Sequence, residues 1–138
     1  MVRLVLRLEF PNRFGLGRGK IELLEQIRAT GSISAAGRAM GMSYRRAWLL
    51  ADSMNQAFPH QGVVETAQGG EHGGGARLTQ FGGVLIDRFR RMEALAGSAL
   101  DRELAALAAA QGASDAKPAA PARPRRKPAR RKASGRVR

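Results

Sequence analysis

The sequence predicts a mainly α-helical fold with one small β-hairpin, and three observations support this prediction. Two helices joined by a tight turn are indicated over residues 31–58. A glycine-rich stretch between two short β segments follows over residues 63–79. Beyond it, apolar residues recur at helical spacing as far as residue 107, which predicts a long final helix.

Capping residues and glycine mark the ends of the two predicted helices. Ser32 stands where a helix N-cap belongs, and Ser43 is a second N-cap candidate that opens the helix of residues 43–58. Gly41 lies between them and tolerates a positive φ. The small residues at 35–37 let the second helix cross closely over the first. A short helix, a glycine turn and a serine-capped helix together are the sequence form of a helix-turn-helix.

The second helix has an apolar face and a polar face. Arg45 and Leu49 fall on the polar face, with Arg46 beside them. Arginines in the first turn of an exposed helix can reach guanine edges or phosphates in a major groove, and a leucine can contact a thymine methyl. An amphipathic helix with a solvated polar face is the alternative. The apolar stripe comprises Tyr44, Ala47, Trp48, Ala51, Met54 and Phe58.

The glycine-rich stretch predicts a hairpin with a long tip. Val63–Thr66 and Arg77–Thr79 are the two β segments, and five glycines lie between them. Directly after a helix-turn-helix such a hairpin is a wing, here residues 67–76. Its glycines let backbone N–H groups approach a phosphate backbone closely. A loop without contacts is the alternative.

The remaining segments complete a domain over residues 1–112. Strict apolar–polar alternation predicts a half-buried strand over residues 2–10, followed by coil and by a helix over residues 20–30. Thr79 is positioned to cap a long helix, Gln80–Gln111, with a kink or break expected at Gly97-Ser98.

The long helix is also a candidate dimerisation surface. If helical throughout, it is about 48 Å long, at about 1.5 Å per residue. A helix of that length in a small domain favours packing on a second copy, and folding back on its own domain is the alternative. The residues expected at the dimer contact are Leu85, Phe89, Met92 and Leu95.

Composition restricts the function classes. The net charge is +13, and residues 113–138 contribute +9 of it from ten Lys/Arg and one acidic residue. This Pro/Ala/Arg/Lys tail is expected to be disordered and to bind nucleic acid through charge. The chain has no cysteine, which excludes disulfides and thiolate chemistry, and no apolar run long enough to cross a membrane. We expect a cytoplasmic, nucleoid-associated protein.

No catalytic constellation is present, so the chain is not expected to be an enzyme. His60 and His72 lie in turn-like segments without partners at ligand spacing, so neither a metal nor a cofactor is expected. The residues expected to contact double-stranded DNA are Ser32, Ser34, Ser43, Tyr44, Arg45, Arg46, Leu49, His72, Gly73, Gly74, Gly75 and Arg77.

Residues 19–96 resemble the DNA-binding domain of the ModE-type, molybdate-responsive transcription regulators, which are related to the LysR-type winged helix. The resemblance rests on GSIS at 31–34 and on the SY, AW and MN pairs within residues 43–55. It continues with the glycine pattern of residues 69–76 and with Leu78-Thr79 followed by Gly82. It implies a dimeric winged helix-turn-helix in which the N-terminal strand and the long C-terminal helix build the dimer.

The tail does not match this family. Its members carry a C-terminal oxyanion-binding region of small β-barrel repeats, which a short basic tail does not resemble. We therefore expect this chain to lack that region, so that molybdate sensing requires a separate molybdate-binding partner protein.

Three functional hypotheses follow. The first is a homodimeric, sequence-specific transcription regulator in which Arg45 and Arg46 contact bases, the serines contact phosphates and the wing lies on the backbone. The second is a low-specificity nucleoid protein that uses the winged helix and the tail together. The third is an interaction module whose tail docks an acidic partner.

Overall fold

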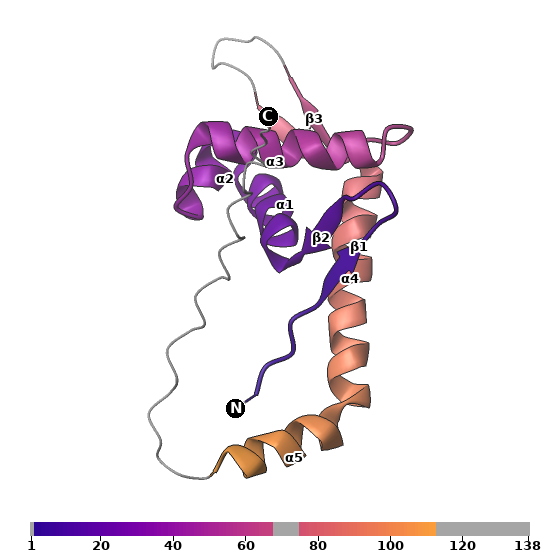
Figure 1. The fold of residues 1–138 in the computed structure, drawn as a ribbon. Helices are drawn as coiled ribbons and strands as arrows, with labels where there is room; N and C mark the ends of the chain where they lie inside the picture. Colours follow the sequence, from indigo (N-terminus) through magenta and orange to yellow (C-terminus); the bar gives the residue numbers. More distant parts are fainter. Residues whose placement is uncertain (1, 68–74, 113–138) are drawn as a thin grey trace, which may run out of the picture. The chain divides into compact units, whose positions relative to one another are not determined.

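The computed structural model describes residues 2–67 and 75–112. Residues 3–101 form one compact unit, and the described residues 102–112 belong to a second unit. None of the described helices is long and apolar enough to cross a membrane. The described elements (Figure 1) are β1 (Arg7–Glu9), β2 (Gly15–Gly17), α1 (Arg18–Thr30), α2 (Ile33–Ala39), α3 (Tyr44–Ala57), β3 (Val64–Thr66), β4 (Ala76–Leu78), α4 (Gln80–Ala99) and α5 (Asp101–Gln111).

Helices α2 and α3 have the predicted order and the predicted caps. Ser32 Oγ accepts the backbone N–H of Ala35 at 2.9 Å, and Ser43 Oγ accepts that of Arg46 at 3.1 Å. Each serine therefore satisfies an N–H group that has no partner within its helix.

The turn between α2 and α3 depends on two glycines. Gly41 has a φ of 73°, a left-handed conformation that glycine adopts without strain. Gly37 lies against α3, because a Cβ added there would sit 2.9 Å from the Cβ of Ala47. Small residues thus permit the close crossing that the sequence predicted.

The N-terminal strand is shorter than predicted, and its partner lies in a segment predicted as coil. β1 pairs antiparallel with β2, with Leu8 opposite Leu16. Over residues 2–10 the even-numbered residues are nevertheless half-buried and the odd-numbered ones exposed, as the alternation indicated. Two glycines concealed the strand character of β2, because glycine weakens a strand pattern. Helix α1 begins at residue 18 rather than 20.

The core lies where α1 meets α3, α4 and the two hairpins. Each large side chain buried there contributes about 1.5–3 kcal/mol through removal of apolar surface from water. A cluster of phenylalanines from three segments, Phe10 and Phe14 from the first hairpin, Phe58 and Phe81, joins this hairpin to α3 and α4 with ring centroids 5.0–5.8 Å apart. The largest fully buried side chains are Phe89, Leu16, Ile21, Leu23, Leu24, Ile27, Met54 and Val63.

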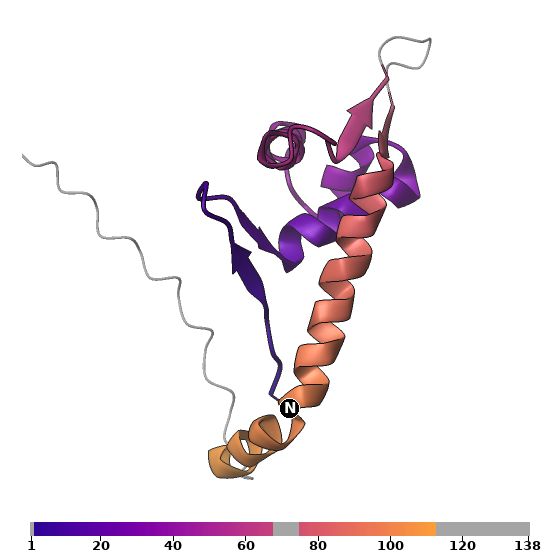
Figure 2. The same cartoon turned by 90° about the vertical axis from the view of Figure 1, so that its right-hand side faces the viewer.

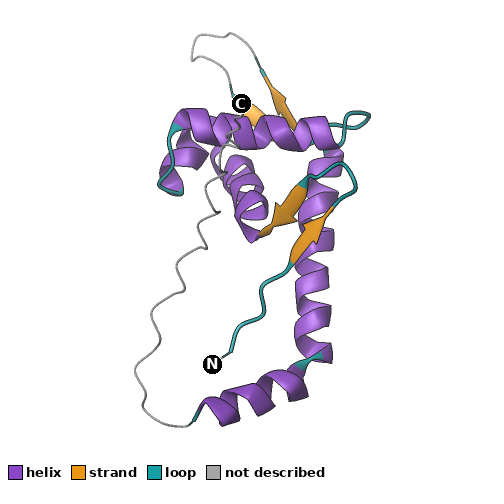
Figure 3. Ribbon diagram, viewed as in Figure 1, coloured by secondary structure: helices purple, strands orange, loops and turns teal. Residues whose placement is uncertain are grey.

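The β3–β4 hairpin forms where a hairpin was predicted (Figure 3). Its first strand begins one residue later than predicted, at Val64, and its second strand lies one residue earlier, at Ala76–Leu78. Its strands pair antiparallel with Glu65 opposite Arg77. Residues 68–74, which include most of the predicted tip, lie outside the described residues. A mainly helical chain with this small hairpin is consistent with a winged helix.

Helix α4 begins as predicted, but the long helix is interrupted later than predicted. Thr79 Oγ1 accepts the N–H of Gly82 at 2.9 Å and so caps α4. Gly82 packs against the backbone oxygen of Val63, and even the Cβ of an alanine at this position would clash with that oxygen. The break falls at Leu100, not at Gly97-Ser98, which are helical. Figures 1 and 2 show α4 extending well beyond α1.

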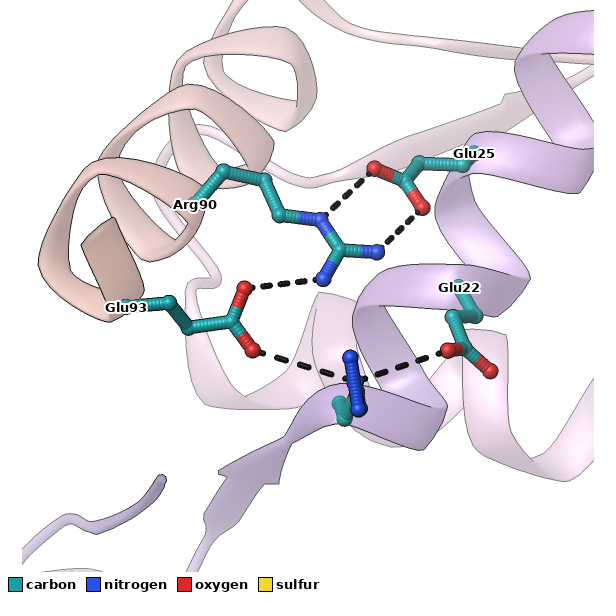
Figure 4. Close-up of polar contacts among 5 residues, drawn as sticks. Glu22, Glu25, Arg90 and Glu93 are labelled. Atoms are coloured by element: carbon teal, nitrogen blue, oxygen red, sulfur yellow. Dashed lines mark hydrogen bonds and ion pairs between the residues drawn. The ribbon is translucent and has the colours of Figure 1, made fainter. Parts of the chain in front are cut away.

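An ion-pair network fixes α4 against α1 (Figure 4). The Arg90 guanidinium donates to both Glu25 carboxylate oxygens, at 2.7 and 3.0 Å, and to Glu93 at 2.8 Å. Arg18 lies 3.6 Å from Glu22 and 3.9 Å from Glu93. The hydrogen bond from Arg90, opposed by partial burial, lowers the pKa of Glu25.

Candidate nucleic-acid interface

The exposed side of α3 has a centre and two flanks. Ala47, Ala51 and Met54 face the core. At about 3.6 residues per turn, the residues opposite them are Arg45 and Leu49, both exposed. Arg46 and Ser53 lie on one flank of this centre, and Tyr44 and Trp48 lie on the other.

Tyr44 and Trp48 are exposed although they belong to the apolar stripe of α3. Tyr44 is 56% exposed and Trp48 is 41% exposed. Both lie at the edge of the apolar stripe, where burial depends on whether a neighbouring element covers the helix. Alanines make the contact with the core, and no described element covers the aromatic side chains.

The centre of α3 combines positive charge with an apolar side chain. Arg45 and Arg46 are exposed and form no ion pair within the described part of the chain. Leu49 is 47% exposed. With Ser43, Leu50 and Ser53 these three residues line an open hollow of about 260 Å³. The two guanidinium groups thus remain available to an anionic partner.

The Arg46 flank of α3 lies near further basic residues, Lys20 and Arg7, which the sequence pattern did not indicate as part of the site. Lys20 Nζ donates to the backbone oxygen of Gly15 at 2.6 Å and lies 4.8 Å from the centre of the Phe14 ring. Burial lowers the pKa of Lys20, and the charges of Arg7 and Arg46 lower it further. These residues are far apart in sequence, so the grouping depends on the first hairpin, which was not predicted.

The β3–β4 hairpin is anchored beside α3 by backbone and side-chain bonds. The N–H of Ala76 donates to Gly31 O, at the α1–α2 junction, at 2.9 Å. The Asn55 side chain accepts from the N–H groups of Val63 and Val64 at 2.7 and 2.9 Å and donates to Val64 O at 3.0 Å. Asn55 therefore connects α3 directly to β3, a role that its position in the MN pair did not indicate.

Arg77 lies on the exposed side of β4, where its Nε donates to Glu65 Oε1 at 3.0 Å. Its side chain remains 81% exposed, so solvent screens most of this ion pair. The other predicted contacts in this region, His72, Gly73 and Gly74, fall within residues 68–74, outside the described residues.

A second open hollow, of about 260 Å³, brings together residues from α2, α3 and the hairpin. Four of the predicted contact residues line it, namely Ser32, Ser34, Tyr44 and Gly75, together with Trp48 and Thr66. Ser43 lies in the other hollow instead. These predicted contacts therefore form two groups. One group includes Arg45 and Leu49, which form the exposed ridge of α3, and the other lies on the flank of Tyr44 and Trp48.

The four predicted dimer residues on α4 differ in burial: two are buried and two are exposed. Leu85 and Phe89 are 8% and 0% exposed and belong to the core of a single chain. Met92 and Leu95 are 36% and 56% exposed on α4. Only the second pair is accessible to a partner without opening the core.

Among the described residues, no group of three or more His, Cys, Asp or Glu could hold a metal ion.

Comparison with known proteins supports the resemblance. No family model matches the chain. It is 38% identical over 102 residues to the molybdenum transport protein ModE of Azotobacter vinelandii, covering 72% of this chain and 37% of that protein. It is 37% identical over 98 residues to the transcriptional regulator ModE of Yersinia pestis, and 36% identical over 98 residues to the DNA-binding transcriptional dual regulator ModE of Escherichia coli K12.

Each of the last two matches covers 71% of this chain and 37% of the relative. The chain therefore spans little more than a third of the length of the relatives that it matches. Two of the three relatives are named as transcriptional regulators and none as an enzyme, in agreement with the expectation of a non-enzyme. At 36–38% identity over about 70% of the chain, the three homologues show that most of this chain is similar to a part of the ModE proteins.

Proposed function

We propose that the chain is a DNA-binding transcription regulator of the ModE type. The observation that carries this proposal is the pair of exposed arginines on α3, Arg45 and Arg46, which form no ion pair with any described residue. They lie beside a hairpin that is anchored to the same helix-turn-helix. The likeness to regulators named ModE supports it independently. Because the proposed partner is chromosomal DNA, the protein would act at the nucleoid.

In this proposal α3 enters the major groove with its exposed ridge toward the bases. Arg45 and Leu49, at the centre of that ridge, contact base edges, because the major groove displays guanine acceptors and thymine methyl groups. The sequence suggested a base contact for Arg46 as well, but Arg46 lies toward one flank of α3 with Ser43. We therefore assign both residues to phosphates of the bordering strand. The hairpin, with Arg77, lies along the backbone.

We further propose that the protein binds as a homodimer, through exposed apolar residues of α4, so that two copies of α3 contact two half-sites. Two-fold operators follow from two-fold protein symmetry. By likeness to ModE proteins, the regulated process is related to molybdenum, and a separate partner protein binds the molybdate.

Selection of bound duplexes from a random DNA library by the full chain tests the proposal. The expected result is a recurring motif, with two inverted half-sites spaced by about one helical turn. Affinity for the selected duplex should exceed that for random duplex by about 10³-fold or more at the same salt concentration. Enrichment of no motif would contradict sequence-specific regulation.

A low-specificity nucleoid protein is the second candidate, and the charge of residues 113–138 favours it. Ten Lys/Arg in that segment supply affinity for any polyanion. Under this alternative the library gives tight binding at low salt with no recurring motif.

A further inference from the structure

The chain contains one tryptophan and one tyrosine, and both line the hollow between α2, α3 and the β3–β4 hairpin. Surface-exposed aromatic side chains are costly to leave in water, and grouped ones mark contact sites more often than single ones do. Trp48 and Tyr44 are four residues apart, so they lie one above the other along the same flank of α3.

The chemistry of the hollow suits an anion with apolar parts. The indole N–H of Trp48 and the hydroxyl of Tyr44 have no hydrogen-bond partner among the described residues. The hydroxyls of Ser34 and Thr66 add further donors along the same wall. No carboxylate belongs to the described lining, and the indole and phenol rings supply apolar faces.

A sugar–phosphate chain has this composition, since it alternates an anionic group with an apolar sugar face. Half to two-thirds of protein–DNA hydrogen bonds go to phosphate and sugar, and tyrosine is among the side chains that make them. The hollow lies on the opposite flank of α3 from Arg46, and Arg45 lies between them. This position favours DNA, because a helix in a major groove has a phosphate strand on each side.

We propose that Trp48 and Tyr44 hold one sugar–phosphate strand of duplex DNA in this hollow, with the Trp48 indole N–H donating to a phosphate oxygen. This inference rests on the proposed function and adds a backbone contact on the hairpin side of α3. The contact is independent of sequence, because phosphates carry no base identity. It places a bound strand on each side of α3, one at Trp48 and one at Arg46.

Because Trp48 is the sole tryptophan, its fluorescence reports on the hollow directly. The full chain is mixed with a random-sequence duplex of about three helical turns, binding is followed by anisotropy of dye-labelled DNA, and acrylamide quenching is measured before and after saturation. The expected result is a several-fold fall in the quenching constant on binding. As a control, the double variant Trp48→Phe/Ser98→Trp moves the indole to the far part of α4, where quenching should not change.

Substitution separates the hydrogen bond from the ring. Trp48→Phe keeps an aromatic face but loses the donor, and it should weaken binding by about tenfold, as expected for one hydrogen bond to a charged group. Trp48→Ala should weaken binding further. In both variants the ratio of affinities for selected and random duplex should be unchanged, and thermal unfolding verifies that each variant is folded.

The outcomes are distinguishable. DNA binding with unchanged quenching and unaltered affinity of Trp48→Phe would overturn the inference while leaving the proposed function intact. A change of the affinity ratio would also overturn it, because Trp48 would then contact a base. No duplex binding by the full chain would overturn the proposed function itself, and this inference with it.

Discussion

Asn55 is the residue on which the placement of the hairpin beside α3 most directly depends. Its amide bonds to three backbone groups of Val63 and Val64, both of which are buried. Asn55→Ala should lower the free energy of unfolding by about 2–4 kcal/mol, because each buried N–H left without an acceptor costs about 1–3 kcal/mol.

Urea denaturation measures this change. Gln56→Ala is the matched control: Gln56 is the next residue of α3, it is exposed, and its amide bonds to the Asp52 carboxylate at 2.7 Å. That substitution should alter stability by less than about 0.5 kcal/mol. Equal effects of the two substitutions would show that the hairpin does not depend on Asn55.

Arg45, at the centre of the exposed ridge of α3, is the proposed base contact. Arg45→Ala should cost about 1–3 kcal/mol on the selected duplex and relax base preference at one position of each half-site. On random duplex the loss should be small. Competition binding with single-position variants of the selected duplex measures both effects.

Arg46→Ala provides the comparison for Arg45→Ala. Arg46 lies on the flank beside Lys20 and Arg7, so its loss should weaken binding to both duplexes by a similar factor. Relaxed preference in Arg46→Ala, with full preference retained in Arg45→Ala, would exchange the roles assigned to the two arginines.

At the scale of elements, the α1–α4 contact couples stability to pH through Glu25. In the folded chain the pKa of Glu25 lies below its ordinary value of 4.5, chiefly because Arg90 donates to the carboxylate. The unfolded chain therefore binds the proton more readily. The stabilisation is fully present above about pH 4.5 and is lost as the pH falls through the lower folded value.

Thermal unfolding from about pH 6 to about pH 3 tests this coupling, with the decline in melting temperature beginning at about the unfolded pKa. Glu25→Gln should melt at a lower temperature than the unaltered chain near neutral pH, and the two should converge at acid pH. Glu9→Gln, which alters a carboxylate of an exposed ion pair on β1, is the control. If the melting temperature of Glu25→Gln and that of the unaltered chain differed by the same amount at every pH, the coupling would be contradicted.

At the scale of the whole molecule, α4 carries the proposed dimer surface. Met92 and Leu95 are exposed, whereas the core face of the helix is occupied within one chain. Met92→Asp with Leu95→Asp should give a folded monomer, since two buried charges without partners would destabilise an apolar contact strongly. Multi-angle light scattering measures the mass, and circular dichroism confirms folding.

Ala94→Asp with Ser98→Asp introduces the same charge on a different exposed face of α4 and should leave the dimer intact. If the unaltered chain has a monomer mass at the concentrations used for DNA binding, the dimer proposal fails. The Met92 and Leu95 pair would then be an ordinary exposed stripe.

Residues 113–138 should contribute affinity without selectivity. Deleting them removes ten Lys/Arg. The slope of log K against log salt concentration should flatten by about 0.9 for each phosphate that the tail neutralises, while the motif selected from random DNA should stay the same. Binding isotherms across a salt series measure the slope. Loss of the motif on deletion would mean that sequence preference resides outside α3.

The sequence by itself determined those features that depend on neighbours along the chain. Ser32, Ser43 and Thr79 could be identified as caps, and Gly41 as a turn residue, because capping and φ preference act within a few residues. The sites of the helix-turn-helix and of the hairpin followed from them. The charge of the tail is a property of composition alone.

The tertiary structure decided which apolar side chains are covered. Periodicity gives the direction in which a residue points from its helix, but burial requires another element to lie in that direction. Trp48 is therefore exposed although it shares a stripe with buried Ala47, and Phe89 fills the core of one chain although it shares a stripe with exposed Leu95. The strand at Gly15–Gly17 likewise exists because β1 supplies its partner across the turn of the first hairpin, and the residue pattern of Gly15–Gly17 alone does not indicate that pairing.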